Sequence, residues 1–301
     1  DADEPGIKAT LEIAKLFDFN KVYHVKLDPA FKDANGYLTA DKVQVFKNTW
    51  WNAKRFVPEG ILSTFQEFDE IIDTSENKVG VPFPFQTLQE KTYGIRTGET
   101  YLFTALEGIG KTEIIRAIEY HLLRTTDSNL GIIHLEEGKD RVLKGLAGYA
   151  IQAPAHLPDT GVTKDAIKDS LHSLIRRDDR LHIYSHFGSD DPDHILDTIR
   201  FLAASCGCKY IFLDHITMVV SGLKEDDERK ALDYISTRLE MMVKELDFSL
   251  IIVSHVNDLG QTRGSRYISK IADLRIDLSR DVAGGSNTVD FDWDSKTNMP
   301  S

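Results

Sequence analysis

The chain has 301 residues, of which 41% are hydrophobic and 9% aromatic, and it carries a formal net charge of −12 at pH 7. This composition is typical of a folded globular protein and excludes an intrinsically disordered one. The sequence shows neither an apolar run long enough to span a membrane nor a leading charged-then-apolar signal, so we expect neither a membrane partner nor secretion. The acidic charge argues against a nucleic-acid binder that uses its whole surface, although it leaves room for a local basic patch.

Residues 1–84 are predicted to hold short helices, a strand and a linker. Hydrophobic periodicity predicts, in chain order, a helix over 7–17, a strand over 21–27, a helix that carries Trp50 and Trp51, and a helix over 61–73. The last of these helices has an apolar stripe at helical spacing. Glycine, proline and asparagine punctuation then predicts a linker over 76–84.

From residue 85 onward, predicted strands alternate with predicted helices. The strands cover 100–104, 130–135, 181–184, 210–213 and 250–254, and the helices cover 113–123, 139–151, 164–176, 192–205 and 228–246. This alternation predicts an α/β fold with a mostly parallel sheet and right-handed crossovers. Ligands of such sheets bind beyond the carboxyl ends of the strands, so we expect the functional residues at those ends.

A glycine-bearing turn joins the first of these strands to the first of these helices. Two glycines in the turn allow successive backbone N–H groups to face one point, at a helix N-terminus that adds partial positive charge. Lys111 is placed to reach the β- and γ-phosphates of a nucleotide, and the Thr112 hydroxyl to bind Mg²⁺. Ala105 stands where the full phosphate-loop pattern has its first glycine, so an ordinary strand-to-helix turn is the alternative. The predicted nucleotide contacts of this turn are Gly108, Ile109, Gly110, Lys111, Thr112 and Glu113.

Carboxylates end two of the other predicted strands. Glu136 and Glu137 follow the strand over 130–135, where a carboxylate is placed to polarise the water that attacks a γ-phosphate. Because adjacent residues of an extended chain point in different directions, only one of the two faces the nucleotide, and its position favours Glu136. Asp214 ends the strand over 210–213 and is predicted to orient the water shell of Mg²⁺. A helix-capping aspartate is the alternative there.

His255 follows the last predicted strand. We predict that it senses the γ-phosphate and relays that state to the segment over 256–266. This segment carries Arg263, Gly264 and Arg266, and a short loop with two arginines suits contacts to a DNA phosphate backbone. A solvated surface loop with a satisfied histidine explains the same residues equally well.

The two cysteines of the chain, Cys206 and Cys208, form a lone Cys-x-Cys without a second pair. We interpret them as neighbouring strand positions of a reduced, intracellular protein rather than as a metal site.

Taken together, the motifs resemble RecA-like replicative helicases of the DnaB type, and more closely the phage primase-helicases and Twinkle-type mitochondrial helicases. The resemblance rests on the phosphate loop, Glu136, the Leu-Asp-His-Ile segment at 213–216 and the Ser-His pair at 254–255. Segments similar to the family also lie at 88–99, 227–230 and 263–265, and the resemblance spans about 80–282. DnaB-type loops often lack the first glycine, which accounts for Ala105.

The resemblance implies an ATP-dependent DNA helicase with a RecA-like, P-loop NTPase core. Its cofactors would be ATP, or another ribo- or deoxyribonucleoside triphosphate, and Mg²⁺. Asp214 and the phosphate loop would hold them, Glu136 would activate water, and His255 would report the γ-phosphate to the loop over 256–266. That loop would grip single-stranded DNA, along which family members move 5′ to 3′. The other implied partners are the further copies of a homo-hexameric ring and a replisome polymerase.

The resemblance also implies a domain order. We expect a partial Toprim-like primase fragment over 1–40, a helical linker or oligomerisation segment over 41–79, and the helicase ATPase domain over 80–301. In the second segment, the striped helix would dock on a neighbouring subunit, with packing on its own core as the alternative. Asp1 and Asp3 resemble the Mg²⁺-binding pair of a Toprim domain. Without the family's upstream glutamate in this sequence, we expect a vestige or a truncation scar rather than a working site.

One departure from the family keeps other functions open. The family supplies an arginine in trans from a strand near its C-terminus, and none follows Thr288-Val289-Asp290-Phe291-Asp292. Arg280 resembles a different family arginine, near the nucleotide, and is the remaining C-terminal candidate. A RecA-type recombinase or circadian-clock ATPase shares the core but does not explain the Toprim-like start. A nucleotide-binding scaffold or loader that does not unwind DNA would explain both the missing arginine and the acidic charge.

Overall fold

The computed structural model describes residues 3–18, 21–28, 30–57, 61–62, 64–74, 78–106, 108–158, 160–184, 191–220, 225–255, 267–280, 289–291, 293–294 and 299–300. The chain divides into two compact units, Asp1–Glu76 and Asn77–Ser301. Residues 41–76, which the sequence assigns to a separate linker segment, therefore fall in the first unit together with 1–40. Within the described part of the chain, no helix is long and apolar enough to cross a membrane.

The first unit is a small helical unit with one short antiparallel strand pair. Its elements are α1 (Glu4–Ala14), β1 (Tyr23–His24), α2 (Ala34–Thr39), α3 (Val43–Trp51), β2 (Lys54–Arg55) and α4 (Phe65–Thr74), and β1 pairs with β2. Tyr37 is fully buried, and its ring lies 4.4 Å from that of Phe31 and 5.5 Å from that of Phe46. The strand predicted over 21–27 is correct in place but only two residues long, and α2 was not predicted.

The predicted apolar stripe lies on α4. This helix begins with a capping box, in which the Thr64 backbone N–H donates to Glu67 Oε2 at 2.9 Å and the Glu67 N–H donates to Thr64 Oγ1 at 3.3 Å. The apolar side chains of the stripe are all exposed, namely Phe65, Phe68, Ile71 and Ile72. The stripe is therefore not packed against a core within the first unit.

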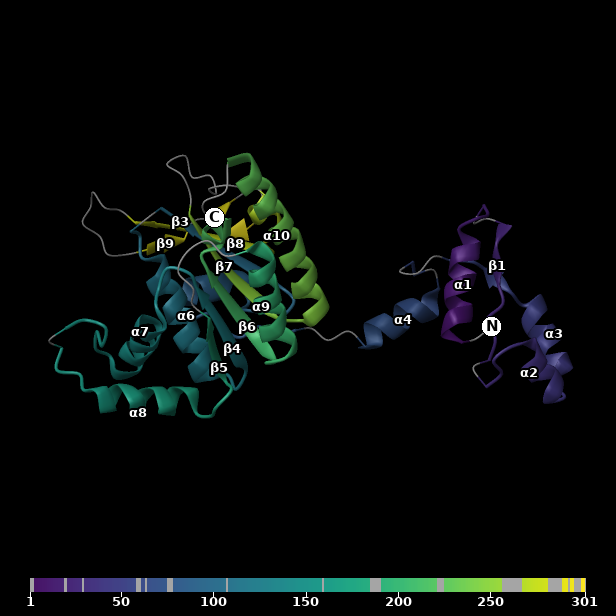
Figure 1. Ribbon diagram of the computed structural model, residues 1–301, viewed down its shortest axis with the longest axis horizontal. Helices are drawn as coiled ribbons and strands as arrows, with labels where there is room; N and C mark the ends of the chain where they lie inside the picture. The colour runs from purple at the N-terminus through teal and green to yellow at the C-terminus, as the bar shows by residue number, and fades with distance from the viewer. Residues whose placement is uncertain are drawn as a thin grey trace. The chain divides into compact units, whose positions relative to one another are not determined.

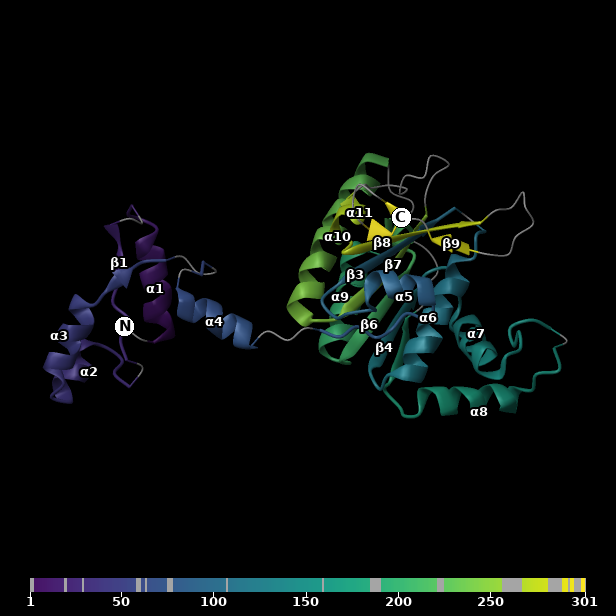
Figure 2. The ribbon, with the colours of Figure 1, turned by 180° about the vertical axis from the view of Figure 1, so that it is seen from behind.

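The second unit is built on a seven-stranded sheet with the order β5-β4-β6-β7-β3-β8-β9 (Figures 1 and 2). All neighbouring pairs are parallel except β8–β9. The strands are β3 (Thr100–Ala105), β4 (Asn129–His134), β5 (Leu181–Tyr184), β6 (Cys208–Asp214), β7 (Ser249–His255), β8 (Leu274–Arg280) and β9 (Val289–Phe291). A separate antiparallel pair joins β10 (Trp293–Asp294) to β11 (Met299–Pro300). The predicted α/β fold with a mostly parallel sheet is confirmed.

Helices cover both faces of this sheet. They are α5 (Gln86–Thr92), α6 (Lys111–Thr125), α7 (Lys139–Ile151), α8 (Lys164–Ile175), α9 (Pro192–Ala204), α10 (Glu225–Leu246) and α11 (Tyr267–Ile271), with a 3-10 turn η2 (Ile216–Val220) after β6. Figures 1 and 2 show α9 and α10 on one side of the sheet and α6 and α7 on the other.

Alternating side chains of the central strands build two separate cores. On β6, Ile211 and Leu213 join the cluster formed with α9 and α10, whereas Tyr210 and Phe212 join the cluster formed with α6 and α7. Strand β7 alternates in the same way. Because both faces are covered, these strands are continuous apolar runs, as is typical of parallel sheets. The sheet is thereby fixed from both sides, which holds its strand ends in place.

The predicted elements of the second unit are found close to their expected bounds, and α7 coincides with the predicted helix over 139–151. The elements that were not predicted are α5, η2, α11, β8, β9, β10 and β11. Cys208 begins β6, but Cys206 lies before that strand, so the expectation of two neighbouring strand positions is wrong for Cys206. Both cysteines are free thiols.

We predict that Gly145→Ala destabilises the second unit, although alanine normally stabilises a helix by about 1 kcal/mol over glycine. A Cβ on Gly145 of α7 would lie 2.6 Å from Cδ and 2.8 Å from Cζ of Arg116 on α6. The Arg116 side chain is buried and ion-paired with Glu113 and Glu137, so it cannot move aside without losing these partners. We expect the free energy of unfolding in urea to fall by about 1–3 kcal/mol. The penalty should shrink in an Arg116→Met background, and an undiminished penalty there would show that Arg116 is not its cause.

Candidate nucleotide-binding site

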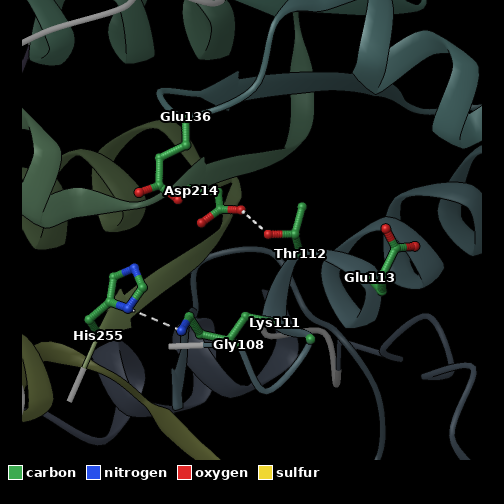
Figure 3. A pocket seen from close by; sticks show the side chains of 8 residues that line it. Gly108, Lys111, Thr112, Glu113, Glu136, Asp214 and His255 are labelled. Atoms are coloured by element: carbon green, nitrogen blue, oxygen red, sulfur yellow. Dashed lines mark hydrogen bonds between the residues drawn. The ribbon is translucent and has the colours of Figure 1, made fainter. Parts of the chain in front are cut away.

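A cleft of about 470 Å³ lies at the carboxyl ends of the central strands (Figure 3). Its lining comes from the turn after β3, from the ends of β4, β6 and β7, and from the start of α6. The lining residues are Gly108, Gly110, Lys111, Thr112, Glu113, Glu136, Asp214 and His255. The structure therefore brings together nearly all of the residues that the sequence predicts to bind or hydrolyse a nucleotide.

The two glycines of the turn are favoured by its backbone conformation and not by a lack of space for a side chain. Gly108 has a φ of +75° and Gly110 a φ of +105°, both in the left-handed region that favours glycine. A Cβ at either position would meet no atom within 4 Å, so space is not the constraint. Gly110 is the N-cap of α6, and the partly buried Ile109 packs against the core beneath the turn. The backbone of the turn is therefore left open to an anion at the positive end of α6.

Lys111 extends under the turn and is only 7% exposed. Its Nζ donates to the carbonyl oxygens of Ala105 at 3.2 Å and Leu106 at 2.8 Å, and lies 3.1 Å from Nδ1 of His255. Figure 3 shows the ammonium group and the His255 ring facing each other across the cleft. A buried ammonium group at a helix N-terminus is the arrangement that a polyphosphate requires.

Thr112 and Asp214 form the second pair in the cleft. The Thr112 hydroxyl donates to Asp214 Oδ2 at 3.2 Å (Figure 3). Asp214 is 5% exposed, and burial raises the pKa of its carboxyl while the neighbouring His134, His215 and Thr112 oppose that rise. A hydroxyl and a carboxylate side by side are the hard oxygen ligands that Mg²⁺ prefers, so this pair fits the ion.

Glu136 and Glu137 point in different directions, as the sequence predicts. Glu136 lines the cleft, has a half-exposed side chain, and places Oε1 2.9 Å from Nε2 of His215. Glu137 instead lies 2.5 Å from Nη2 of Arg116 and 3.0 Å from Nε of Arg141. Burial works to raise the pKa of Glu137, but the His134 and Arg116 contacts lower it to about 2. Glu137 is therefore bound to other protein groups, and Glu136 is the carboxylate that faces the cleft.

A buried ionic cluster that the sequence analysis did not identify lies behind the cleft. Arg116 and Glu119 on α6 approach the end of β4, where Glu119 Oε1 lies 2.9 Å from Nε2 of His134 and Glu119 is fully buried. Burial works to lower the pKa of His134, but Glu119 outweighs it and raises that pKa to about 10. The cluster joins α6, which begins at the phosphate loop, to the strand that precedes Glu136. The spacing of Glu113, Arg116 and Glu119 along one helix face is the signal of it in the sequence.

His215 is a second residue that the sequence analysis did not assign. It follows Asp214 and is 5% exposed. Its ring contacts Glu136 and lies edge-on to that of His255, with ring centroids 4.3 Å apart. Ligand atoms of Glu136, His215 and His255 lie within 4.8 Å of one another, a set that can hold a metal ion. A polar residue directly after a strand-ending aspartate is the sequence signal that marks this position.

Glu113 lines the cleft, but its side chain is ion-paired with Arg116. Other predicted residues lie elsewhere. Arg280 is the last residue of β8. Asp3 caps α1 through one carboxylate oxygen, and the other lies 2.8 Å from Nζ of Lys32. The remaining predicted residues, Asp1, Arg263, Gly264 and Arg266, lie outside the described residues.

The fold and the cleft define a nucleotide-binding core of the phosphate-loop class. Residues 80–279, more than half of the chain, match the profile of the DnaB-like helicase C-terminal domain. The chain therefore belongs to the DnaB-like helicase C-terminal domain family.

Individual relatives agree with that family. The chain is 28% identical to a DNA helicase/primase of Enterobacteria phage T3 over 304 residues, which is 94% of this chain and 53% of the relative. It is 23% identical to the replicative DNA helicase DnaB of Leifsonia xyli subsp. xyli, over 73% of this chain and 49% of the relative. The chain thus spans about half the length of these relatives.

Solved structures share the fold. One of them, described as an ATPase domain, superposes with a TM-score of 0.56 at 21% identity, covering 72% of this chain and 82% of that one. A DnaB-like replicative helicase, solved in a study of its interactions with primase, also gives a TM-score of 0.56, at 17% identity, covering 92% of this chain and 65% of that one. The RecA-like fold predicted from the sequence is confirmed.

We predict that the buried His134–Glu119 pair makes stability depend on alkaline pH. A histidine with a raised pKa stabilises the folded state fully below its unfolded pKa of about 6.5, and this contribution is lost as the pH rises toward about 10. The free energy of unfolding in urea should therefore fall between pH 6.5 and pH 10, by on the order of a few kcal/mol. In Glu119→Gln the neutral amide cannot hold the extra proton on His134, so the slope should flatten. Equal slopes in the two proteins would contradict the pairing.

Proposed function

We propose that this chain is the motor part of a replicative DNA helicase, which hydrolyses ATP and moves along single-stranded DNA as a ring. One observation carries the proposal: in a chain of the DnaB-like family, Lys111, Thr112, Asp214, Glu136 and His255 converge on a single cleft. These groups come from four neighbouring strand ends and supply an anion site, a cation site and a carboxylate in one place. That combination suits the hydrolysis of a nucleoside triphosphate.

The phosphate side of the cleft would bind the nucleotide. Backbone N–H groups around Gly108 and Gly110 face the phosphates, and Lys111 exchanges its present partners for phosphate oxygens. Thr112 and Asp214 would hold Mg²⁺, which when bound neutralises charge on the β- and γ-phosphates. Lys111, Thr112 and Asp214 already line the cleft, so little rearrangement is required for the nucleotide to bind.

Glu136 would act as the general base. Its carboxylate accepts a proton from a water molecule as the water oxygen forms a bond to the γ-phosphorus. The bond between that phosphorus and the β–γ bridging oxygen breaks, which leaves a diphosphate and inorganic phosphate. Glu136 supports this role better than Glu137 because its side chain faces the cleft, whereas Glu137 is held by Arg116 and Arg141.

His255 would link the nucleotide to DNA. It ends β7 beside Lys111, and the segment over 256–266 follows it directly. In this proposal Arg263, Gly264 and Arg266 of that segment contact the backbone of single-stranded DNA, and the direction of movement is 5′ to 3′, as in similar helicases. Arg280 would lie near the nucleotide.

Ring formation would use the exposed stripe of α4. Phe65 and Ile72 are 84% and 70% exposed, and burying such side chains on a neighbouring copy is favourable by about 25 cal/mol per Å². We propose a homo-hexamer held in part by this helix, with a replisome polymerase as a further partner. The relative named as a DNA helicase/primase aligns over 94% of this chain, which supports a Toprim-derived origin for the first unit. Asp3 is held by Gly6 and Lys32, which favours a vestigial Toprim site over a working one.

ATP hydrolysis with and without single-stranded DNA tests the proposed function. We expect the DNA to raise the rate, because DNA bound at the segment after β7 would act on His255. Lys111→Ala should abolish hydrolysis in both conditions, since it removes the buried ammonium group from the phosphate site. A phosphate-release assay measures both, with a DNA-unwinding assay as the second step.

Each alternative has its own outcome in this assay. Hydrolysis that ignores DNA would contradict a translocating helicase and favour a nucleotide-binding scaffold or loader. The same rate in Lys111→Ala and wild type would show that the cleft is not where hydrolysis occurs.

The two adjacent glutamates give a paired test. Glu136→Gln should lower kcat by about 10²–10⁴-fold while the affinity for a fluorescent ATP analogue is retained, because only the proton acceptor is lost. Glu137→Gln should keep most of the turnover and instead lower the unfolding free energy, because it weakens the cluster around Arg116. Steady-state kinetics and urea unfolding of both variants measure these effects. The reverse pattern would assign the base to Glu137.

A further inference from the structure

His215 lies beside the cleft and touches both Glu136 and His255. It follows Asp214 at the end of β6, between the ends of β4 and β7, which are the two neighbours of β6 in the sheet. Nε2 of His215 lies 2.9 Å from Oε1 of Glu136, and its ring is edge-on to that of His255 with a centroid separation of 4.3 Å. The ring thus stands between the carboxylate and the histidine beside Lys111.

The hydrogen bonds of His215 fix the orientation of its ring. An ionised carboxylate only accepts hydrogen bonds, so Nε2 of His215 carries the proton and donates to Glu136. In the neutral ring Nδ1 is then an acceptor, and it lies 2.5 Å from the Thr217 hydroxyl, which donates to it. These two contacts fix the tautomer of the neutral ring, with the proton on Nε2 and the acceptor at Nδ1.

Glu136 has more freedom than the ring that holds it. Its side chain is 50% exposed, whereas that of His215 is 7% exposed and enclosed by the sheet. A half-exposed glutamate samples several rotamers unless another group restrains it. The buried ring therefore restrains the mobile carboxylate, and its Nε2 proton selects the orientation in which Oε1 faces β6.

The contacts continue from His215 to the phosphate side. His255 lies 3.1 Å from the Lys111 ammonium group, which also donates to the carbonyl oxygens of Ala105 and Leu106. An ammonium group has three donors, so a phosphate oxygen that binds Lys111 must compete with these partners. If phosphate binding reorients the His255 ring, the His215 ring must adjust its position, because the two rings are in edge-to-face contact.

We propose that His215 is a positioning residue, which holds the Glu136 carboxylate through Nε2–H and makes its orientation depend on His255. The inference rests on the proposed function, in which Glu136 is the base and His255 reports the nucleotide and the DNA. His215 itself takes no proton from the attacking water. It places the acceptor, and it connects that acceptor to the strand that leads into the DNA-contacting segment.

Two amide substitutions separate the two nitrogens of the ring. The side-chain nitrogen of Gln in His215→Gln reaches the place of Nε2, whereas that of Asn in His215→Asn reaches only the place of Nδ1. We expect His215→Asn to lower kcat by about 10²-fold, the cost of a misplaced reacting group. KM for ATP should change little, because the phosphate loop is untouched, and His215→Gln should retain most of the wild-type kcat. Thr217→Val, which frees the ring to turn, should lower kcat in the same direction as His215→Asn.

The experiment measures kcat and KM for ATP with and without single-stranded DNA in wild type and these three variants. His194→Asn, an exposed histidine of α9, is the matched control and should equal wild type. Affinity for a fluorescent ATP analogue reports whether each variant keeps its fold. We also expect His215→Asn to lose most of the stimulation by DNA, since the path from His255 to Glu136 is interrupted.

Every outcome decides the inference. Equal losses in His215→Gln and His215→Asn would show that the ring acts by packing alone, and a wild-type kcat in His215→Asn would show that Glu136 needs no restraint. Either result overturns the proposal while leaving the helicase function standing. A wild type that hydrolyses ATP without stimulation by DNA contradicts the proposed function instead, and the Gln–Asn comparison of kcat still decides the role of His215. A wild type without hydrolysis overturns both.

Discussion

The site depends on one constraint, which is that neighbouring parallel strands end at the same edge of a sheet. Ala105 pairs with His255, and His134 pairs with Asp214, so residues far apart in the chain are placed side by side by backbone register. The register tolerates no slip, because a shift of one residue would exchange the two faces of a strand and bury the wrong side chains. The two apolar cores, one on each face, hold that register. The cleft is therefore a consequence of how the sheet is packed.

Charge burial imposes the second constraint. Arg116, Glu119, His134 and Glu137 lie behind the cleft, where unpaired charges would cost several kcal/mol each. They are tolerated because each charge has an opposite partner within the cluster. The cluster also connects α6 to the strand before Glu136, so two walls of the cleft are joined by buried ion pairs. It explains why the two adjacent glutamates differ: Glu137 is ion-paired with Arg116, whereas Glu136 faces the cleft.

The sequence predicts those parts of the molecule that rest on periodicity or on local backbone chemistry. The strands β3 to β7, α7 and the phosphate loop belong to this group, because long apolar patterns and glycine positions are local signals. Elements of a few residues, such as β9 and α11, give too short a pattern to detect. The role of His215 was out of reach for a different reason. It depends on contacts with Glu136 and His255, and these contacts follow from the order of the strands in the sheet. No local sequence pattern predicts that order.

The acidic charge of the chain is compatible with the proposed role on DNA, because the groups that would meet phosphate are few and local. In the cleft, the buried ammonium group of Lys111 and the N-terminus of α6 would face the phosphates of the proposed nucleotide, whereas the nearby carboxylates are engaged by a hydroxyl, a histidine or an arginine. The net charge of −12 is a sum over the whole chain, and exposed charges more than about 10 Å away are largely screened at physiological ionic strength. What decides anion binding is therefore the geometry within a few ångströms of Lys111. In the proposed function, donors there would face the phosphates and acceptors would lie on the side of water and metal, which is the separation that hydrolysis of a phosphoanhydride requires.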